Sequence, residues 1–276
     1  MRIACCVSHS SGSSLWACLG AIAKLKGAEL DPVRVIIGKR SMTDSMNAAL
    51  DIAFRADAEL LLHLESDVLL TPQAVERMLE AYVAAETYLV LGSSYNPLLD
   101  RLEADRVRLL DMGIIRDRFR LGNEATPYQD FCADVEKETG LRQVVSPNDN
   151  AVAYWHPVWT GEELHAQFCQ VYPQLEDEAL QARMESFLTR GLQLDPSNRA
   201  LLAGKAALQS VLVDAGRQDN VRFRDYNYCA KQLDLDGTEY YVRHKFYASL
   251  AKSTLDSDLQ AVCDQPESHV PLIHWR

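Results

Sequence analysis

Residues 60–82 read LLLHLESDVLLTPQAVERMLEAY, and this stretch decides the fold. Its opening run is apolar at nearly every position, which is typical of a strand buried on both faces inside a parallel sheet. Two carboxylates, Glu65 and Asp67, follow where the run ends. Thr71 is a good N-cap, and Pro72 suits the first position of a helix. The stretch therefore predicts a buried strand, an acidic turn and a helix capped by Thr71.

The same alternation extends to both sides of this stretch. Strands are expected at 2–9, 33–38, 59–66 and 87–95, and helices at 15–27, 45–57 and 71–85. Buried strands that alternate with helices predict an α/β fold, Rossmann-like, with a mostly parallel sheet flanked by helices. Ligands of such sheets bind at the carboxyl ends of the strands.

The second half of the chain changes character. A strand is expected at Met112–Ile115, a helix at 128–140 closed by Gly140, and short strands at 141–147 and 150–156. From about residue 161 to 216 the pattern is helical only, and the tail is aromatic and charged. We therefore expect a first domain at 1–160 and a mainly helical region at 161–276.

Composition limits the classes of function. The 276 residues are 47% hydrophobic and 24% charged, which is ordinary for a globular protein. A net charge of -11 disfavours duplex nucleic acid as a partner, although a local basic groove remains compatible with it. No apolar run approaches the roughly 18 to 20 residues of a membrane span, and no basic leader precedes the first apolar stretch. Seven cysteines without a C-x-x-C pair argue against a disulfide framework. These features predict a soluble, cytoplasmic protein.

The acids that end the central strand need a neutralising partner. A carboxylate at the end of a buried strand is costly unless a donor, a basic group or a cation faces it. Mg²⁺ and Mn²⁺ prefer oxygen ligands and commonly bridge to phosphate. Glu65 and Asp67 therefore suit a metal-bridged diphosphate. The alternative is that they only begin a solvent-facing loop, with Asp67 supporting the next helix.

The stretch RSMTDSMNAALDIAFRADAELLLHLESDVLLTPQAVERMLEAY, residues 40–82, resembles the core of GT-A fold glycosyltransferases, particularly the large inverting family that uses nucleotide-sugar donors. There, a helix with a Ser-x-Ala-Arg-Asn-like sequence leads to an apolar strand, an Asp-x-Asp motif and a Pro-initiated helix. Asn47 stands on the Asn of the helix. The resemblance implies that Asp67 is the principal metal ligand and that Glu65 contacts the ribose or the metal.

A second match follows about 60 residues later. YQDFCADVEKETGLRQVVSPNDNAVAYWH, residues 128–156, resembles the segment of that family in which an acid-Asp pair begins a helix and a His closes the next strand. The resemblance implies that Asp130 is the catalytic base and that His156 binds the metal or the diphosphate. From the residues alone, Asp130 is equally a helix-terminal acid and His156 a packed core histidine. Trp155 and Trp159 either stack on a sugar or fill space.

The sequence departs from the family pattern at several positions. The Arg before the Asn is Met46, so its contact to the donor phosphates is missing or is supplied by Lys39 or Arg40, which by default are solvated side chains. Gln129 replaces the acid before the base. Ser8 ends the first strand and is a candidate donor contact, and the Ser/Gly turn after it offers backbone N–H groups.

Together these matches predict an inverting, metal-dependent glycosyltransferase. It would move a sugar from a UDP- or GDP-sugar to a glycan or another hydroxyl acceptor, with Mn²⁺ or Mg²⁺ as cofactor. Two alternatives stay open. One is glycosylation of modified bases in nucleic acid, against which the acidic charge counts. The other is a catalytically degenerate GT-A protein that serves as a partner-binding module.

The helical remainder carries weaker signals. Residues 187–217 resemble one unit of the tetratricopeptide repeat, and a plain helical hairpin fits them equally well. Because about three repeats are needed for a stable array, a single unit is expected to pack on the first domain or to form a homo-oligomer contact. Four tyrosines beside basic residues form either an acceptor-binding wall or core: Tyr226, Tyr228, Tyr240 and Tyr241.

Overall fold

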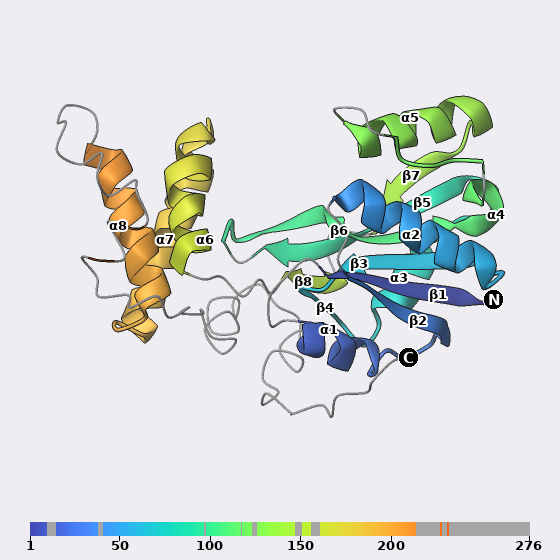
Figure 1. Cartoon of the computed structure of the whole chain (residues 1–276), viewed down its shortest axis with the longest axis horizontal. Helices are drawn as coiled ribbons and strands as arrows, with labels where there is room; N and C mark the ends of the chain where they lie inside the picture. The colour runs from blue at the N-terminus through green and yellow to red at the C-terminus, as the bar shows by residue number, and fades with distance from the viewer. Residues whose placement is uncertain are drawn as a thin grey trace. The chain divides into compact units, whose positions relative to one another are not determined.

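A computed structural model describes residues 1–9, 15–37, 41–96, 98–116, 118–122, 126–146, 151–155 and 161–213, and the single positions 227 and 231 (Figure 1). Their contacts divide them into two units. The first holds the described residues of 1–95 and 102–155, and the second holds those of 96–101 and 161–213.

Within the described residues, eight strands form one sheet in the order β2-β1-β3-β6-β5-β8-β4, and β7 pairs with β5. Their bounds are β1 Ile3–His9, β2 Leu30–Ile37, β3 Leu60–Glu65, β4 Val68–Leu70, β5 Thr87–Asn96, β6 Arg101–Asp111, β7 Arg142–Val145 and β8 Ala153–Trp155. Strand β1 runs parallel to β2 and β3, and β5 runs parallel to β7 and β8. The sheet is mixed because β6 runs antiparallel to β3, and β4 to β8.

Helices cover both faces of this sheet, which confirms the α/β class. One face packs against α2 (Met42–Arg55), α4 (Met112–Ile115) and α5 (Pro127–Thr139). The other face packs against α1 (Leu15–Ile22) and α3 (Ala74–Ala81). Figure 1 shows α2 and α5 on the opposite side of β1 from α1. We call the first of these sides the α2/α5 face.

The leucine-rich strand contributes to both faces. Leu61 of β3 lies in the core under α2, whereas Leu62 and Leu64 lie in the core under α1 and α3. Successive side chains of a strand point to opposite faces, so a strand covered on both sides must be apolar at nearly every position. The run at 60–64 meets this requirement, with His63 as its one polar member.

Two expectations about local structure were wrong. Residues Met112–Ile115 form the short helix α4 and not a strand, because the Asp111 carboxylate accepts hydrogen bonds from the backbone N–H groups of Gly113 and Ile114. Helix α3 begins at Ala74 with Gln73 as N-cap, so Thr71 does not cap it. The N–H of Thr71 donates to the Val152 carbonyl at 2.9 Å, which holds this residue on the sheet edge.

Helix α5 ends as its sequence predicts. Gly140 adopts a left-handed conformation with φ of 71°, and its N–H donates to the Glu136 carbonyl. A residue with a side chain would be strained there, so glycine ends the helix and turns the chain toward β7.

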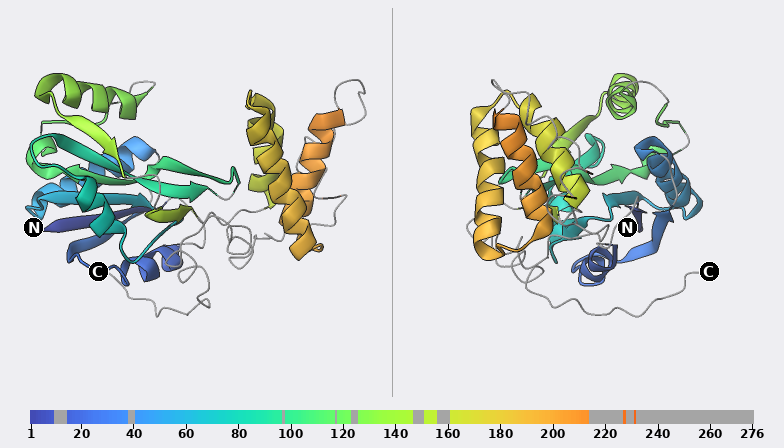
Figure 2. Two further views of the ribbon diagram at one scale, coloured as in Figure 1. Left: turned by 180° about the vertical axis from the view of Figure 1, so that it is seen from behind. Right: turned by 60° about the vertical axis from the view of Figure 1, so that its left-hand side comes forward.

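The second unit is helical, as expected for residues 161–213. Its elements are α6 (Gly161–Ala166), the π-helical turn η1 (Gln167–Val171), the 3-10 turn η2 (Tyr172–Gln174), α7 (Glu178–Leu194) and α8 (Arg199–Val213). Figure 2 shows α6, α7 and α8 running side by side. A Cβ on Gly204 of α8 would lie 3.1 Å from atoms of both Leu164 and Leu188, so this glycine allows α8 to approach α6 and α7.

Helices α7 and α8 form a hairpin, and the tetratricopeptide resemblance is not confirmed beyond this. Arg183 of α7 donates to the carbonyls of Leu99 and Asp100, which belong to the same unit. The four tyrosines at 226, 228, 240 and 241 lie outside the described residues. None of the described helices combines the length and apolarity that crossing a bilayer requires.

Candidate active site

The candidate site lies where β1 and β3 end side by side. In the parallel register of these strands, Ser8 is the partner of Glu65. The N–H of Ser66 donates to the Ser8 carbonyl at 2.9 Å, which fixes the start of the acidic turn. This is the carboxyl edge of the parallel strands, where sheets of this class bind ligands. The structure therefore places Ser8, Glu65 and Asp67 at one edge.

Glu65 forms an ion pair with an arginine from the neighbouring strand. Its Oε2 accepts from Nη1 of Arg106 on β6 at 3.0 Å, and both side chains are largely buried. The pKa of Glu65 is nevertheless raised, first by burial and then by the charge of Asp67, while Arg106 and Arg108 act in the opposite direction. Burial and the nearby Asp67 thus outweigh the two arginines in their effect on the pKa of Glu65.

Asp67 is held by one of its two oxygens. Its Oδ2 accepts from the indole N–H of Trp155 on β8 at 2.8 Å. Its Oδ1 is buried and has no hydrogen-bond partner among the described residues. The guanidinium of Arg106 lies 3.8 Å from the centre of the Trp155 ring. Arg106 and Trp155 therefore connect Glu65 to Asp67 in one chain of contacts.

This arrangement fits a divalent cation held mainly by Asp67. The unpartnered Oδ1 is an oxygen ligand with no competing donor, which suits Mg²⁺ or Mn²⁺. Among the described residues, no three His, Cys, Asp or Glu side chains come close enough to hold an ion by themselves. Waters and phosphate oxygens would therefore complete the coordination, which is the usual mode for Mg²⁺. Metal binding by Glu65 stays a prediction, because Arg106 engages its Oε2.

Ser8 takes part in a polar network beneath the acidic turn. Its hydroxyl lies 2.8 Å from Nε2 of His63, and Nδ1 of His9 lies 3.0 Å from the hydroxyl of Ser66. His63 is fully buried, and burial, assisted by the charge of Arg108, lowers its pKa to about 3. The imidazole is therefore neutral at physiological pH. A donor contact by Ser8 stays a prediction.

Asn47 positions a neighbouring segment. Its side-chain nitrogen donates to the Leu121 carbonyl at 2.9 Å, and its oxygen accepts from the Leu121 N–H at 3.0 Å. Both ends of the amide are thus used to hold the chain that leads into α5. Met46, before it, is 1% exposed and packs in the core of the α2/α5 face. A direct donor contact by Asn47 stays a prediction.

Asp130 lies in the first turn of α5, apart from the contacts that join Ser8, Glu65 and Asp67. Its Oδ2 accepts from the hydroxyl of Thr126 at 3.1 Å. The side chain is partly exposed, so an acceptor hydroxyl can reach it. Helix α5 touches the sheet nearby, where the guanidinium of Arg108 lies 5.0 Å from the centre of the Tyr128 ring.

Several candidate residues lie outside the described part of the chain. They are Lys39, Arg40, His156, Trp159 and the turn at 10–14. Their predicted roles therefore stay predictions. Trp155 is described, and it bonds Asp67 through its ring nitrogen.

Sequence reasoning missed three residues of the site: His63, Arg106 and Arg108. Arg106 and Arg108 follow a stretch of mixed charge, but they alternate with apolar residues just before two leucines. That alternation is the signal of a strand with one polar face, and it places both arginines on the same side of the sheet. His63 was the only ionisable residue in an apolar run.

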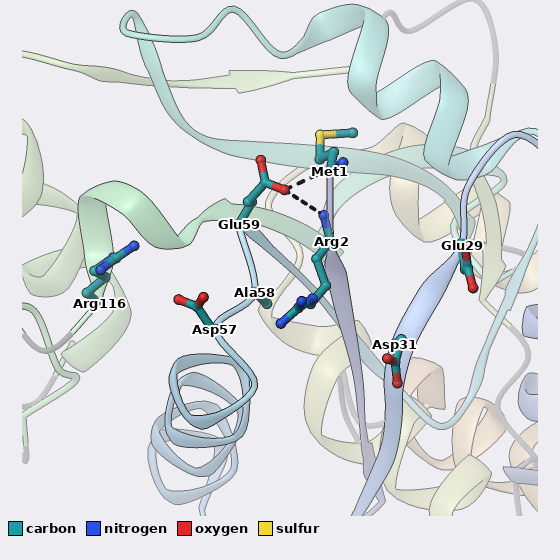
Figure 3. A pocket seen from close by; sticks show the side chains of 8 residues that line it. All are labelled: Met1, Arg2, Glu29, Asp31, Asp57, Ala58, Glu59 and Arg116. Atoms are coloured by element: carbon teal, nitrogen blue, oxygen red, sulfur yellow. Dashed lines mark hydrogen bonds and ion pairs between the residues drawn. The ribbon is translucent and has the colours of Figure 1, made fainter.

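A polar pocket of about 640 Å³ lies at the opposite edge of the sheet (Figure 3). Most of its lining residues lie at or just before the starts of β1, β2 and β3, and one follows α4: Met1, Arg2, Glu29, Asp31, Asp57, Ala58, Glu59 and Arg116. Glu59 binds the backbone of the chain start, since its Oε1 accepts from the Arg2 N–H at 2.8 Å. Because ligands of parallel sheets bind at the carboxyl ends of strands, this pocket is not the candidate site.

Comparisons with known proteins give distant likenesses only. No family model matches the chain, and no curated protein sequence matches it significantly. S. aureus TarS 1–349 in complex with UDP-GlcNAc has a TM-score of 0.41 at 13% identity, over 95% of this chain and 90% of that one. A protein from Desulfovibrio desulfuricans G20, described as a nucleotide-diphospho-sugar transferase whose activity is only inferred, has a TM-score of 0.35 at 12% identity, over 66% of this chain and 94% of that one. The 4-diphosphocytidyl-2C-methyl-D-erythritol synthase of Anaerococcus prevotii has a TM-score of 0.34 at 9% identity, over 53% and 90%. With TM-scores below 0.5, none of these decides the family or the activity of this chain.

Proposed function

We propose that this protein is a glycosyltransferase that moves a sugar from a nucleotide-sugar donor to an acceptor hydroxyl, with a divalent cation and inversion at the anomeric carbon. Support comes from the sequence resemblance and from the placement of Glu65 and Asp67 at the carboxyl edge of the parallel strands. The observation that carries the proposal is the buried, unpartnered Oδ1 of Asp67. A carboxylate oxygen in that position is destabilised until a cation or a donor faces it.

The protein side chains divide the work of such a transfer. Trp155 fixes the Asp67 carboxylate through Oδ2, which leaves Oδ1 directed to its ligand. Arg106 pairs with Glu65, which offsets the charge of that carboxylate next to the site proposed for the leaving diphosphate. When bound, Mn²⁺ or Mg²⁺ supplies Lewis-acid stabilisation of the charge that develops on the diphosphate.

Asp130 takes the proton from the acceptor hydroxyl as general base. Its position in the first turn of α5 suits this role, because the side chain there is partly exposed and within reach of an acceptor hydroxyl. The hydroxyl oxygen then forms the new bond to the anomeric carbon as the bond to the diphosphate breaks. A single displacement of this kind inverts the anomeric centre.

A thermal-shift screen of nucleotide sugars with and without Mn²⁺ tests the proposal. A donor that binds the native state raises the melting temperature by mass action, and we expect one nucleotide sugar to do so only when metal is present. A panel of UDP- and GDP-sugars identifies the nucleotide at the same time. If no nucleotide sugar stabilises the protein in the presence of Mn²⁺, the proposal fails and a degenerate, partner-binding protein becomes the better account.

A further inference from the structure

Strand β6 brings two arginines to the α2/α5 face. His63 and Arg108 are register partners of β3 and β6. Leu110 lies in the core of the α2/α5 face, and alternate residues of a strand share a face, so Arg106 and Arg108 point to that side too. Arg108 lies two residues further from the carboxyl end of β3 than the ion pair of Arg106 and Glu65.

Arg108 is a buried cation with spare hydrogen-bond donors. It is 6% exposed, and its Nε and Nη1 have no hydrogen-bond partner. Within the part of the chain that the structure describes, no carboxylate forms an ion pair with it, because the nearby Glu65 is bound to Arg106. Its guanidinium lies 5.0 Å from the centre of the Tyr128 ring, a cation–π contact that offsets only part of the cost of burial.

Two further buried groups beside Arg108 lack partners. Nδ1 of His63 has none, and Nε2 of the same ring lies 2.8 Å from the Ser8 hydroxyl. The Tyr128 hydroxyl makes no hydrogen bond of ordinary length and angle, although Arg108 and Cys132 lie close enough to it for weak hydrogen-bond contacts. Three neighbouring side chains therefore carry buried polar atoms without an ordinary hydrogen-bond partner, and two of them, Arg108 and Tyr128, can donate to a ligand whichever tautomer His63 adopts.

Such a cluster is costly unless an anion meets it. Burying one guanidinium without a counter-charge costs several kcal/mol, and leaving polar groups unpaired adds to that cost. The fork of donors on a guanidinium matches the oxygens of a phosphate group. The partly exposed Tyr128 ring lies beside Arg108, so a ligand that reaches the guanidinium would have to displace this side chain.

We propose that Arg108, with Tyr128 and His63 beside it, forms a subsite for a phosphoryl group. The phosphoryl group would come either from the diphosphate of the donor or from a phosphate carried by the acceptor. Only this choice of source rests on the proposed function. In the first case Arg108 supplies the phosphate contact that Met46, packed in the core, cannot make.

Titration of the full-length protein with inorganic pyrophosphate, without metal or nucleotide, tests the subsite by thermal shift and calorimetry. Pyrophosphate should stabilise the parent protein saturably. Arg108→Met should weaken its binding about ten- to a hundredfold, the size expected for charge-assisted hydrogen bonds. The matched control is Arg142→Met, which removes an exposed arginine of β7 and should leave the affinity unchanged.

The melting temperature without ligand separates this role from a structural one. Removal of a buried, unpaired charge should leave Arg108→Met at least as stable as the parent protein. Tyr128→Phe keeps the ring and removes one donor. It should therefore fold normally but bind pyrophosphate more weakly than the parent protein does. It decides the question if Arg108→Met does not fold. The proposal is overturned if pyrophosphate does not stabilise the parent, or if Tyr128→Phe and a folded Arg108→Met both bind it as the parent does.

Two further titrations identify the source of the phosphoryl group. If it is the donor diphosphate, UDP or GDP competes with pyrophosphate, and Arg108→Met weakens binding of that nucleotide but not of its nucleoside. If it belongs to the acceptor, pyrophosphate still binds when the nucleotide site is saturated. Because the pyrophosphate titration contains no sugar and no metal, failure of the proposed function leaves its result unchanged.

Discussion

The indole N–H of Trp155 donates to Oδ2 of Asp67 at 2.8 Å, and this contact joins strand β8 to the acidic turn that follows β3. The same ring carries the guanidinium of Arg106 on its face. One tryptophan thus orients the aspartate and positions the arginine that neutralises Glu65. The two acids of the turn are organised by residues from β6 and β8, which lie far from them in the sequence.

Trp155→Phe should weaken this arrangement without emptying the space. The phenyl ring retains most of the packing and the cation–π contact, but Oδ2 of Asp67 loses its donor. We expect a loss of about 1.5–3 kcal/mol in the free energy of unfolding, as for a hydrogen bond to a charged group. Urea denaturation measures it. An unchanged stability would mean that the hydrogen bond contributes nothing to the fold.

His63 should make the protein sensitive to acid. Its pKa is about 3 in the folded chain and near 6.5 when unfolded, so between these values the unfolded state binds more protons. Stability should therefore fall as the pH drops through this window, by about 2 kcal/mol between pH 7 and pH 5 from this residue.

A His63→Gln variant isolates that contribution. Other groups titrate in the same range in both proteins, so the difference between the two slopes of unfolding free energy against pH belongs to His63. The variant should have the shallower slope in denaturant titrations at pH 7, 6 and 5. Equal slopes would show that the imidazole is not buried in its neutral form.

Gly92 of β5 should tolerate no side chain. A Cβ there would lie 2.6 Å from Cγ2 of Val152 and 3.0 Å from Cβ of Val107. Gly92→Ala should destabilise the protein by about 1–3 kcal/mol through overpacking. The matched control is Gly20→Ala in helix α1, where a Cβ would meet nothing within 4 Å. The control should be neutral or slightly stabilising, since alanine favours helix.

Asp130→Asn should separate binding from chemistry. The amide keeps the shape and can still bond Thr126, but it cannot take a proton, so donor binding should persist while transfer falls about a hundredfold or more. Asp134→Asn, which changes an exposed acid one turn further along α5, is the matched control. Turnover at the parent rate in Asp130→Asn would assign Asp130 to helix capping only.

Much of the fold could be predicted from the sequence because its signals are local. The apolar runs that form β1, β3 and β5 are buried from both sides, so composition alone marks them. Gly140 ends α5 through its own backbone freedom. Strand β6 was missed, because its charged residues are mixed with short apolar bursts and no clear period emerges. Two of them, Arg106 and Arg108, instead face the buried side of the site.

The site could be predicted in place but not in detail. The position of Glu65 and Asp67 followed from the end of a buried strand. Their partners, Arg106 and Trp155, come from strands 41 and 88 positions away, and no local pattern identifies such contacts. Thr71 was mispredicted for a similar reason. Its residue type suits an N-cap, but its N–H bonds the Val152 carbonyl, a contact distant in the sequence, and the helix begins three residues later.

The account depends most on a cation at Asp67. A calorimetric titration of the donor found in the screen, into the parent and into Asp67→Ala with Mn²⁺ and with EDTA, tests this directly. We predict tight binding to the parent with Mn²⁺ and a loss of at least about tenfold in affinity both with EDTA and in Asp67→Ala, whose far-UV circular dichroism should match the parent. Equal donor affinity in all of these titrations would contradict the account.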